Sequence, residues 1–368
     1  MKITLTTGIF PPDIGGPASF IPMFADKLLE KGIDVEIITL SDTEEDYSKY
    51  PYKVIAINRK IKKPFRDYFV IKEIIKSAKT SDLIFSNTLA FESAVASIIV
   101  KKPLIQKVVG DIAWERANSS NRFKGSLDDY QSSNNLCLKS KLTNIYRNFG
   151  VNHSDLIITP SKYLCNIVKK WTNKDVKVIY NAVEFVYIKQ IIPKEKFRII
   201  SVARLIPHKG IDGIIRTLSK LNFEFEYIVL GDGNLKKELE NLARSLNIDA
   251  KFLGNVSKKE VAKYLKSSDL FILNSSYEGL PHVILEAMYY ECPIIASNVG
   301  GTPEIVKDGE NGFLFEYNNQ KELLKKIYLL KDENIKEKII KNAKQFVKQF
   351  ADVDKMVEEY IKIFERFV

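Results

Sequence analysis

The sequence has little cysteine, little histidine and no long apolar run. It holds three Cys and three His among 368 residues, and Cys137, Cys165 and Cys292 form no CxxC pair. A disulfide scaffold and a zinc ribbon are therefore excluded, a His-rich metal site is disfavoured, and a reducing compartment is favoured. The longest apolar run, residues 94–100, is far shorter than the ~18 residues of a spanning helix. Residues 1–7 are too polar for a signal-peptide core, so we expect a cytoplasmic protein.

Basic residues outnumber acidic ones. Lys and Arg total 56 against 46 Asp and Glu, which gives a formal net charge of +10. Hydrophobic residues make up 45% of the chain, a proportion that excludes a disordered protein. The excess positive charge is compatible with three kinds of partner: nucleic acid, an anionic membrane surface or an anionic substrate. Because no nucleic-acid-binding motif accompanies the charge, we expect no nucleic acid.

Short apolar runs alternate with helical patterns along the whole chain. The strand candidates are residues 2–7, 34–39, 52–57, 83–86, 104–109 and 156–159, followed by 198–203, 226–230, 251–253, 270–273 and 294–297. Helical patterns such as 20–31 and 235–246 lie between them. This alternation is typical of parallel sheets built from βαβ units. Two such series predict an α/β protein with two Rossmann-like domains that face a central cleft.

Composition places the domain boundary near residues 181–196, where Pro193 and a charged run separate the two series. We assign residues 1–183 to the first domain and 184–351 to the second. The apolar stripe of residues 352–368 predicts a terminal helix. We further expect this helix to cross back to the first domain. The polar segment 118–135 has no period and is interpreted as a loop, of the kind that covers a site.

A pair of glycines follows the first strand. Gly15 and Gly16 stand where a strand turns into the helix near residue 20. Glycines at such a turn let backbone N–H groups approach a phosphate, and the helix dipole favours the anion. The segment is neither GxGxxG nor a Walker loop, and a tight turn without a ligand is the alternative.

Two cations follow the first strand of the second series. Arg204 and Lys209 are spaced R-x4-K at a strand end beside a helix start. A pair placed in this way can clamp a diphosphate and replace a divalent metal. A solvated loop is the alternative interpretation.

The strongest candidate segment is 275–288. Pro281 suits the first position of a helix, so Glu278 lies just before the helix and Glu286 one to two turns into it. Two carboxylates so placed can accept hydrogen bonds from the hydroxyls of a sugar and a ribose. The alternative is a pair of ordinary surface acids. The residues whose N–H groups would point at an anion or a sugar oxygen are Gly279, Leu280 and His282.

These motifs together resemble glycosyltransferase family 4, whose members have the two-domain GT-B fold. The resemblance covers nearly the whole chain and includes Gly231 after a strand, the pair Asn255 and Val256, and the segment 300–304. It implies sugar transfer from a nucleotide-diphosphate sugar with retention of anomeric configuration. It also implies a second domain that binds the donor and a first domain that binds the acceptor.

The resemblance also implies roles for the residues. Arg204 and Lys209 would hold the diphosphate, Glu278 would orient the donor sugar, and Glu286 would bind the ribose. Gly16 would lie beside the phosphates, and the backbone of 255–256 near the base. No metal or other cofactor is expected. The only D-x-D string, 352–354, begins the terminal helix and is interpreted as a feature of that helix start.

The sequence departs from the family at one position. Many members carry a His after the fifth strand of the first domain, whereas this chain has Gly110 and Asp111 there. Asp111 or Glu115 is a candidate to face the reacting centre instead, as an acceptor-side base or an electrostatic partner. The alternative is that Asp111 caps a helix that begins near residue 112.

A basic stretch with interleaved aromatics covers residues 58–79. Its cations are Arg59, Lys60, Lys62, Lys63, Arg66, Lys72, Lys76 and Lys79. A basic amphipathic stretch can dock on anionic lipid headgroups, and a solvated face is the alternative. We therefore expect a peripheral enzyme of polysaccharide or glycoconjugate biosynthesis, with a glycan or lipid-linked acceptor. The rival functions are a nucleotide-sugar 2-epimerase of the same fold and a non-catalytic protein that binds membranes or nucleic acid by charge.

Overall fold

The structure is a computed structural model that describes residues 1–13, 15–120 and 122–368. The chain forms two compact units, Met1–Asn181 with Val353–Val368 (unit 1) and Ala182–Asp352 (unit 2). The change of unit at residue 181 falls two residues before the position expected from composition. The terminal segment belongs to unit 1, as the sequence predicts.

Unit 1 contains a parallel sheet of seven strands in the order β3-β2-β1-β4-β5-β6-β7. The strands are β1 (Lys2–Thr6), β2 (Asp34–Ser41), β3 (Lys53–Asn58), β4 (Leu83–Ser86), β5 (Leu104–Lys107), β6 (Leu156–Thr159) and β7 (Val176–Val178). The helices are α1 (Gly16–Glu30), α2 (Phe65–Ala78), α3 (Ala90–Val100), α4 (Ile112–Ser119), α5 (Leu127–Ser132), α6 (Leu138–Asn152), α7 (Lys162–Val168) and α15 (Val353–Phe364).

Unit 2 contains a parallel sheet of six strands in the order β10-β9-β8-β11-β12-β13. The strands are β8 (Phe197–Val202), β9 (Phe225–Leu230), β10 (Ala250–Gly254), β11 (Leu270–Leu273), β12 (Ile294–Ser297) and β13 (Phe313–Phe315). The helices are η1 (Pro207–Lys209), α8 (Ile211–Leu218), α9 (Lys236–Ser245), α10 (Lys258–Lys266), α11 (His282–Tyr289), α12 (Thr302–Ile305), α13 (Gln320–Leu329) and α14 (Glu333–Phe350).

The strand order of each sheet reverses once. In unit 1 the first strand lies between β2 and β4, and in unit 2 the strand β8 lies between β9 and β11. At such a reversal the loops after the two central strands leave in opposite directions and open a crevice at the carboxyl edge of the sheet. These two positions are therefore where the fold of each unit favours a ligand.

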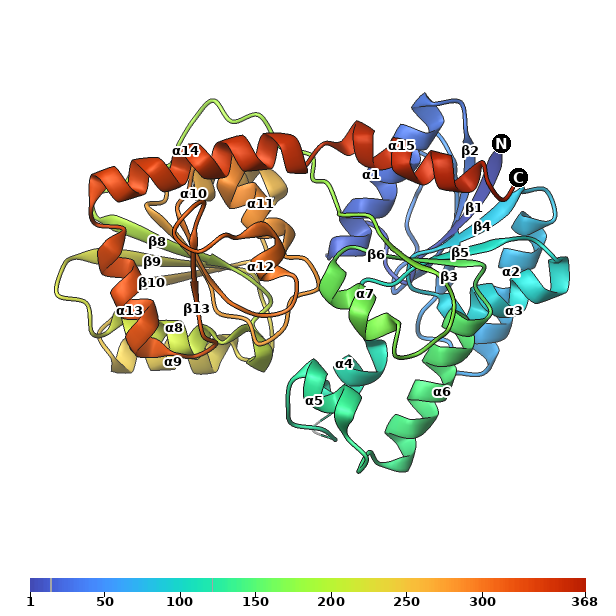
Figure 1. Cartoon of the computed structure of the whole chain (residues 1–368), viewed down its shortest axis with the longest axis horizontal. Coiled ribbons are helices and arrows are strands. Elements are labelled where there is room, and N and C mark those ends of the chain that lie inside the picture. The colour runs from blue at the N-terminus through green and yellow to red at the C-terminus, as the bar shows by residue number, and fades with distance from the viewer. Residues whose placement is uncertain (14, 121) are drawn as a thin grey trace. The chain divides into compact units, whose positions relative to one another are not determined.

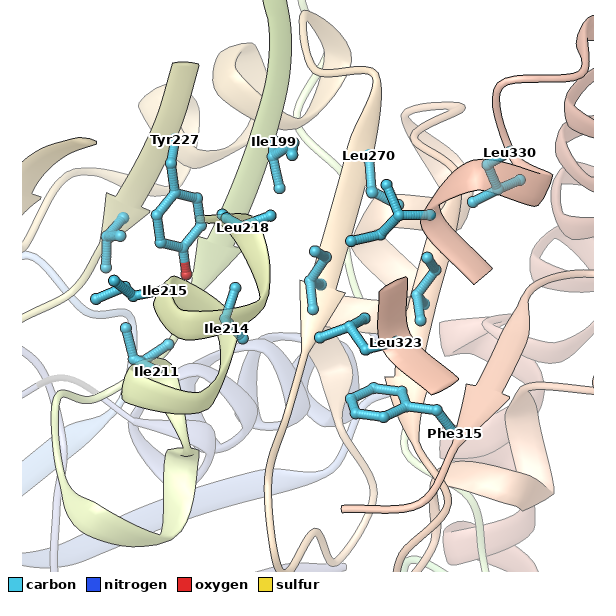
Figure 2. Packing of buried hydrophobic residues seen from close by; sticks show 14 of the residues in the cluster. Ile199, Ile211, Ile214, Ile215, Leu218, Tyr227, Leu270, Phe315, Leu323 and Leu330 are labelled. Atoms are coloured by element: carbon cyan, nitrogen blue, oxygen red, sulfur yellow. The ribbon is translucent and has the colours of Figure 1, made fainter. Parts of the chain in front are cut away.

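Both sheets are buried on their two faces. The central strands β4, β5, β11 and β12 are buried along their whole length, which explains their apolar character without strict alternation. Figure 2 shows the core on one side of the unit 2 sheet, where Ile199 and Leu270 lie with Ile214 and Leu218 of α8 and Leu323 of α13. This packing fixes the carboxyl ends of the strands and the loops that follow them.

The terminal helix α15 packs against α1 in unit 1 (Figure 1). Its rings form an aromatic cluster with the sheet and with α1: Tyr360 lies 4.9 Å from Phe24, and Phe364 lies 5.6 Å from Phe85, between ring centroids. Tyr360 and Phe364 are fully buried. The helix is therefore part of the core of unit 1, although 171 residues of unit 2 precede it (352 − 182 + 1).

Three details differ from the sequence-based expectation. The strands β7 and β13 were missed, because three residues are too few to show a period. The segment 118–135 is not one continuous loop, because α4 extends to Ser119 and α5 follows. A capping box, in which Ser126 and Asp129 satisfy each other's backbone N–H groups, begins α5.

Candidate active site

The loops after β8 and β11 meet at the reversal of the unit 2 sheet. Lys209 Nζ lies 2.6 Å from Glu278 Oε1, and the same oxygen accepts a hydrogen bond of 2.6 Å from Ser275 Oγ. The backbone N–H of Ser276 donates to the carbonyl of His208 at 2.8 Å. The side chains of Lys209 and Glu278 are only 13% and 12% exposed. The structure therefore brings together two residues that are 69 positions apart.

The electrostatics of this loop pair are dominated by positive charge. Burial, together with the charges of Lys209 and Arg204, lowers the pKa of His208 to about 4, against an opposing effect of Glu278. His208 is thus neutral near pH 7, while Arg204 has an exposed side chain beside it. A neutral imidazole flanked by two cations and one carboxylate suits a dianionic ligand.

Glycines make this arrangement sterically feasible. Gly231 has a φ of 123°, and a Cβ there would overlap the carbonyl oxygen of Ala203, next to Arg204. Gly300 has a φ of 57°, and a Cβ there would overlap the carbonyl oxygen of Glu278. The N–H of Gly301 donates to that same carbonyl at 2.9 Å. The loops after β9 and β12 therefore pack directly on the backbone of the two central loops.

Asn274 holds the ends of this site together and was missed in the sequence. Its Nδ2 donates to the carbonyl of Gly210 at 2.8 Å and to Asn318 Oδ1 at 2.7 Å, and its Oδ1 accepts from the N–H of Asn318 at 3.0 Å. The side chain is buried. The available signal was a single Asn directly after an apolar strand, a pattern that has many other meanings.

The segment before α11 was expected to direct N–H groups at an anion or a sugar oxygen, and in the structure the helix begins one residue later than expected. Pro281 is the cap of α11 and not its first residue, so the helix begins at His282. Gly279 and Leu280 lie in the turn before it, and Leu280 is buried. In the first turn of the helix, the N–H of Ile284 donates to the carbonyl of Pro281 at 3.1 Å.

Glu286 lies one turn into α11. Burial raises its pKa to about 7, and the charge of Lys258 at the start of α10 partly opposes this. A carboxyl that is half protonated near neutral pH can both donate to and accept from hydroxyl groups. Asn255 and Val256 lie just before α10, whose start is fixed by a capping box between Ser257 and Glu260.

In unit 1 the loop from Gly8 to Gly16 follows β1 at the reversal of the sheet. The N–H of Gly8 donates to Thr88 Oγ1 at 2.5 Å, which joins the ends of β1 and β4. Arg59 Nη2 donates to the carbonyl of Gly8 at 3.1 Å and to Asp13 Oδ2 at 2.5 Å. Gly15 caps α1, and a Cβ on Gly16 would meet no atom within 4 Å. Gly8 and Asp13 are thus held in place, while Gly16 borders open space.

Asp111 is used structurally, which corrects the suggestion that it faces the reacting centre. Its Oδ1 caps α4 by accepting from the N–H groups of Ala113 at 2.9 Å and Trp114 at 3.4 Å. Its Oδ2 accepts from Arg147 at 2.6 Å and from Gln131 at 2.7 Å. The side chain is fully buried. The capping alternative therefore holds, extended by an ion pair that the sequence did not indicate.

A small cavity of about 150 Å³ lies beside this network in unit 1. Its walls come from the loop after β4, the start of α3, the end of β5 and the loop after it, α4 and α6. They include the candidate Glu115 together with Phe91, Tyr146 and Trp171. Glu115 therefore lines the cavity, whereas Asp111 is buried and is not part of its wall.

Among the described residues, no three His, Cys, Asp or Glu side chains are grouped so that they could hold a metal ion. Over the same residues, no helix has the length and apolar character needed to cross a bilayer.

Comparison with known proteins assigns the family. The family model described as "Glycosyltransferase Family 4" matches residues 14–185, and the model described as "Glycosyl transferases group 1" matches residues 185–346. An uncharacterized glycosyltransferase of Methanocaldococcus jannaschii is 31% identical, over 99% of this chain and 98% of its own length. The chain belongs to glycosyltransferase family 4. It is a glycosyltransferase, as the motifs predicted.

Other relatives and structures agree with this assignment. A Campylobacter jejuni enzyme, the GalNAc-alpha-(1->4)-GalNAc-alpha-(1->3)-diNAcBac-PP-undecaprenol alpha-1,4-N-acetyl-D-galactosaminyltransferase, is 26% identical over 85% of this chain and 82% of its own length. Anabaena HepE in complex with UDP and glucose has a TM-score of 0.82 at 22% identity, with 100% of both chains covered. Sucrose-phosphate synthase of Thermosynechococcus elongatus has a TM-score of 0.80 at 16% identity, over 99% of this chain and 98% of its own. These likenesses show the GT-B fold.

Proposed function

We propose that the protein is a retaining glycosyltransferase that uses a nucleoside-diphosphate sugar as donor, without a metal ion. The observation that carries the proposal is the pairing of Lys209 with Glu278 at 2.6 Å, beside Arg204, at the reversal of the unit 2 sheet. A diphosphate carries charge that must be neutralised as it departs, and two fixed cations supply this neutralisation. HepE, which has the same fold, has been solved in complex with UDP-glucose.

The geometry suggests how unit 2 would act. The donor diphosphate competes with Glu278 for Lys209, and Glu278 then turns to hydroxyls of the donor sugar. Glu286 binds the ribose, and the turn at 279–280 contributes N–H groups. The acceptor oxygen attacks the anomeric carbon on the face from which the diphosphate leaves. One C–O bond forms as the C–O bond to phosphate breaks. Because Asp111 is fully engaged in unit 1, we assign the acceptor's proton to the departing phosphate oxygen.

The acceptor proposed here is a lipid-linked glycan in the synthesis of a surface polysaccharide or glycoconjugate. The Campylobacter relative acts, by its name, on an undecaprenol-diphosphate glycan. Unit 1 of this chain exposes large apolar side chains on α2 and on α6, where Leu142 is 57% and Ile145 66% exposed. The exposed residues of α2 are Phe65, Tyr68 and Phe69.

The basic stretch 58–79 supplies charge around this surface, with one correction. Arg59 is engaged by Asp13 and Asp42 and by two backbone carbonyls, so it is not available to a membrane. Lys60, Lys62 and Lys72 are exposed. We propose that anionic lipid headgroups bind there, at the cytoplasmic face of a membrane.

Donor turnover tests the enzymatic proposal. Wild-type protein, K209A and E278A are compared in hydrolysis of a panel of UDP- and GDP-sugars, with and without EDTA. Loss of at least about 100-fold in both variants is expected, since each removes charge stabilisation in the transition state. EDTA should change nothing. Unchanged rates in both variants would remove the proposal.

Product analysis separates the proposal from the 2-epimerase alternative. A retained anomeric configuration in a glycan product, read from the coupling constant of the anomeric proton, supports transfer. An epimerised nucleotide sugar formed without acceptor contradicts it.

Flotation of wild-type protein with anionic vesicles tests the membrane surface, and K60E/K62E is expected to abolish flotation. Binding that is equal on neutral vesicles at low salt would count against lipid charge as the cause.

A further inference from the structure

Unit 2 has a groove that lies outside the candidate donor site. It has a volume of about 210 Å³ and is lined by residues 186–188, by the carboxyl end of α11, by Lys266 at the end of α10 and by one face of α14. Glu278 lies before the amino end of α11 and His282 lies at that end, opposite the end that lines the groove. The groove is lined by none of the residues assigned to the candidate donor site, although α11, which carries Glu286, connects the two.

The groove is held open by specific contacts. The hydroxyl of Tyr290 donates to the carbonyl of Val186 and accepts from its N–H, both at 2.9 Å. The ring of Phe185 stacks on Tyr289 with centroids 3.9 Å apart and an angle of 4° between planes. These contacts fasten the chain that enters unit 2 onto α11. The wall is thus built before any ligand arrives, which lowers the entropic cost of binding.

Aromatic surface remains available in the groove. Tyr187 is 77% exposed and Tyr289 is 37% exposed. A tyrosine ring that faces water presents an apolar face beside a polar hydroxyl. Such a surface suits the C–H face of a sugar ring, which has hydroxyl groups around its edge.

The charges of the groove narrow the chemical class of the ligand further. The groove contains Lys266, Lys344 and Lys348 against a single acid, Glu291, which pairs with Lys344. Lys344 and Lys348 stand one turn apart on α14. Lysines bind a carboxylate or phosphate, whereas the hydroxyls of Tyr187 and Tyr289 can form hydrogen bonds with the hydroxyls of a sugar. A ligand that satisfies both carries an acid group and several hydroxyls.

We propose that this groove is a second carbohydrate site, which binds an acidic sugar residue of a glycan chain. Its volume is below the roughly 300 Å³ at which pockets for whole drug-sized ligands begin, so it accommodates one ring of a longer chain. The proposal rests on the proposed function only in that the glycan is then the acceptor or product of transfer. A site far along the glycan from the transfer point keeps a growing chain on the enzyme by raising its effective concentration.

The test is calorimetric titration of the intact chain with trigalacturonate, with neutral maltotriose and with inorganic phosphate. Trigalacturonate is expected to bind, more weakly at high salt, and more tightly than the other two. In K348E and in Y187A its affinity should fall by about fivefold or more, the equivalent of about 1 kcal/mol. The control K338E changes the same charge at an exposed position of α14 outside the groove and should bind as wild type does.

Three outcomes would overturn the proposal. They are no binding of trigalacturonate, equal binding of maltotriose or phosphate, and equal loss in K338E. Vesicle flotation that K348E weakens would assign the groove to lipid instead. Donor hydrolysis is measured on the same variants and should stay at the wild-type rate. Wild-type protein that binds trigalacturonate but turns over no donor would overturn the proposed function and leave the groove intact.

Discussion

Asp111 and Arg147 form a buried ion pair that joins the start of α4 to α6. Arg147 Nη1 lies 2.6 Å from Asp111 Oδ2, and the guanidinium carbon lies 3.8 Å from the ring centroid of Trp171. The indole N–H of Trp171 donates to Gln131, which in turn donates to Asp111. Four side chains from different elements are closed into one network. The Asp111 carboxylate stands where the sequence departs from the family's His. In this structure it holds α4, α5 and α6 together.

Arg147→Met should destabilise the protein by about 3–5 kcal/mol, because it leaves the Asp111 carboxylate buried without its cation. Urea denaturation measures this free energy of unfolding. The control K31M breaks the exposed pair between Lys31 and Glu358 and should cost less than about 1 kcal/mol.

Asp111→Asn keeps the helix cap, and the folded fraction of this variant should keep the wild-type kcat. A loss of kcat in folded D111N would return Asp111 to a catalytic role.

Gly16→Ala should leave stability unchanged within about 0.5 kcal/mol, because a Cβ there meets no atom within 4 Å. Donor turnover should nevertheless fall, since the added methyl group occupies the space beside the helix start where the phosphates are proposed to lie. Thermal unfolding and donor kinetics on one preparation give both values. The comparison variant is Gly15→Ala, whose φ of 153° is rarely adopted by other residues, and which should unfold at a lower temperature. Full activity of G16A would place the phosphates elsewhere.

Glu286→Gln should flatten the dependence of stability on pH. The carboxyl has a pKa of 4.5 in the unfolded chain and about 7 in the folded protein, because burial disfavours its charge. Between these values the folded state binds more protons, so wild-type stability falls as pH rises from about 4.5 to 7. The variant lacks this decline, and its melting temperature relative to wild type should rise across that window. Parallel curves for the two proteins would show that Glu286 is not buried in this way.

Lys107→Met should stabilise unit 1. The amine of Lys107 is fully buried and makes no hydrogen bond among the residues that the structure describes; its nitrogen lies 3.1 Å from the ring centroid of Phe20. Burial holds the pKa of Lys107 well below its ordinary value of 10.5. Between the lowered pKa and 10.5 the unfolded chain binds more protons than the folded protein, so this residue makes stability rise with pH over that range.

The melting temperature measured at several values of pH checks this prediction. The variant should melt higher than wild type near neutrality, and the difference should shrink as pH approaches 10. Lys102→Met, at a residue outside the strand, is the control for a lost surface charge. A variant that melts lower than wild type at every pH would show that the amine has a favourable partner.

The sequence predicted the layout of strands well because buried parallel strands are compact apolar runs. Residues 83–86, 156–159, 270–273 and 294–297 were expected as strands and match β4, β6, β11 and β12 to the residue. The meeting of Lys209 and Glu278 could also be anticipated in part, since the carboxyl ends of parallel strands share one edge. Their direct contact depends on side-chain positions that no spacing records.

Other features depend on contacts between distant segments and could not be predicted in this way. Asp111 could be recognised as a possible cap from its local sequence, but its partner Arg147 lies 36 residues away on another helix. Arg59 appeared as one cation of a basic stretch, whereas folding directs it to Asp13 and the Gly8 carbonyl. Charge counted along a chain does not distinguish a surface cation from one that holds a loop.

The position of α15 has a consequence for how this protein is made. Unit 1 consists of residues on both sides of unit 2, and Tyr360 and Phe364 fill its core from the last helix. A ribosome completes unit 2 before it releases the residues that unit 1 still lacks. Domains fold as units in the order in which they emerge, so unit 2 can fold first and independently. The half that holds Gly16 completes its core only after residues 353–364 have been made, so a chain that stops before α15 lacks part of that core.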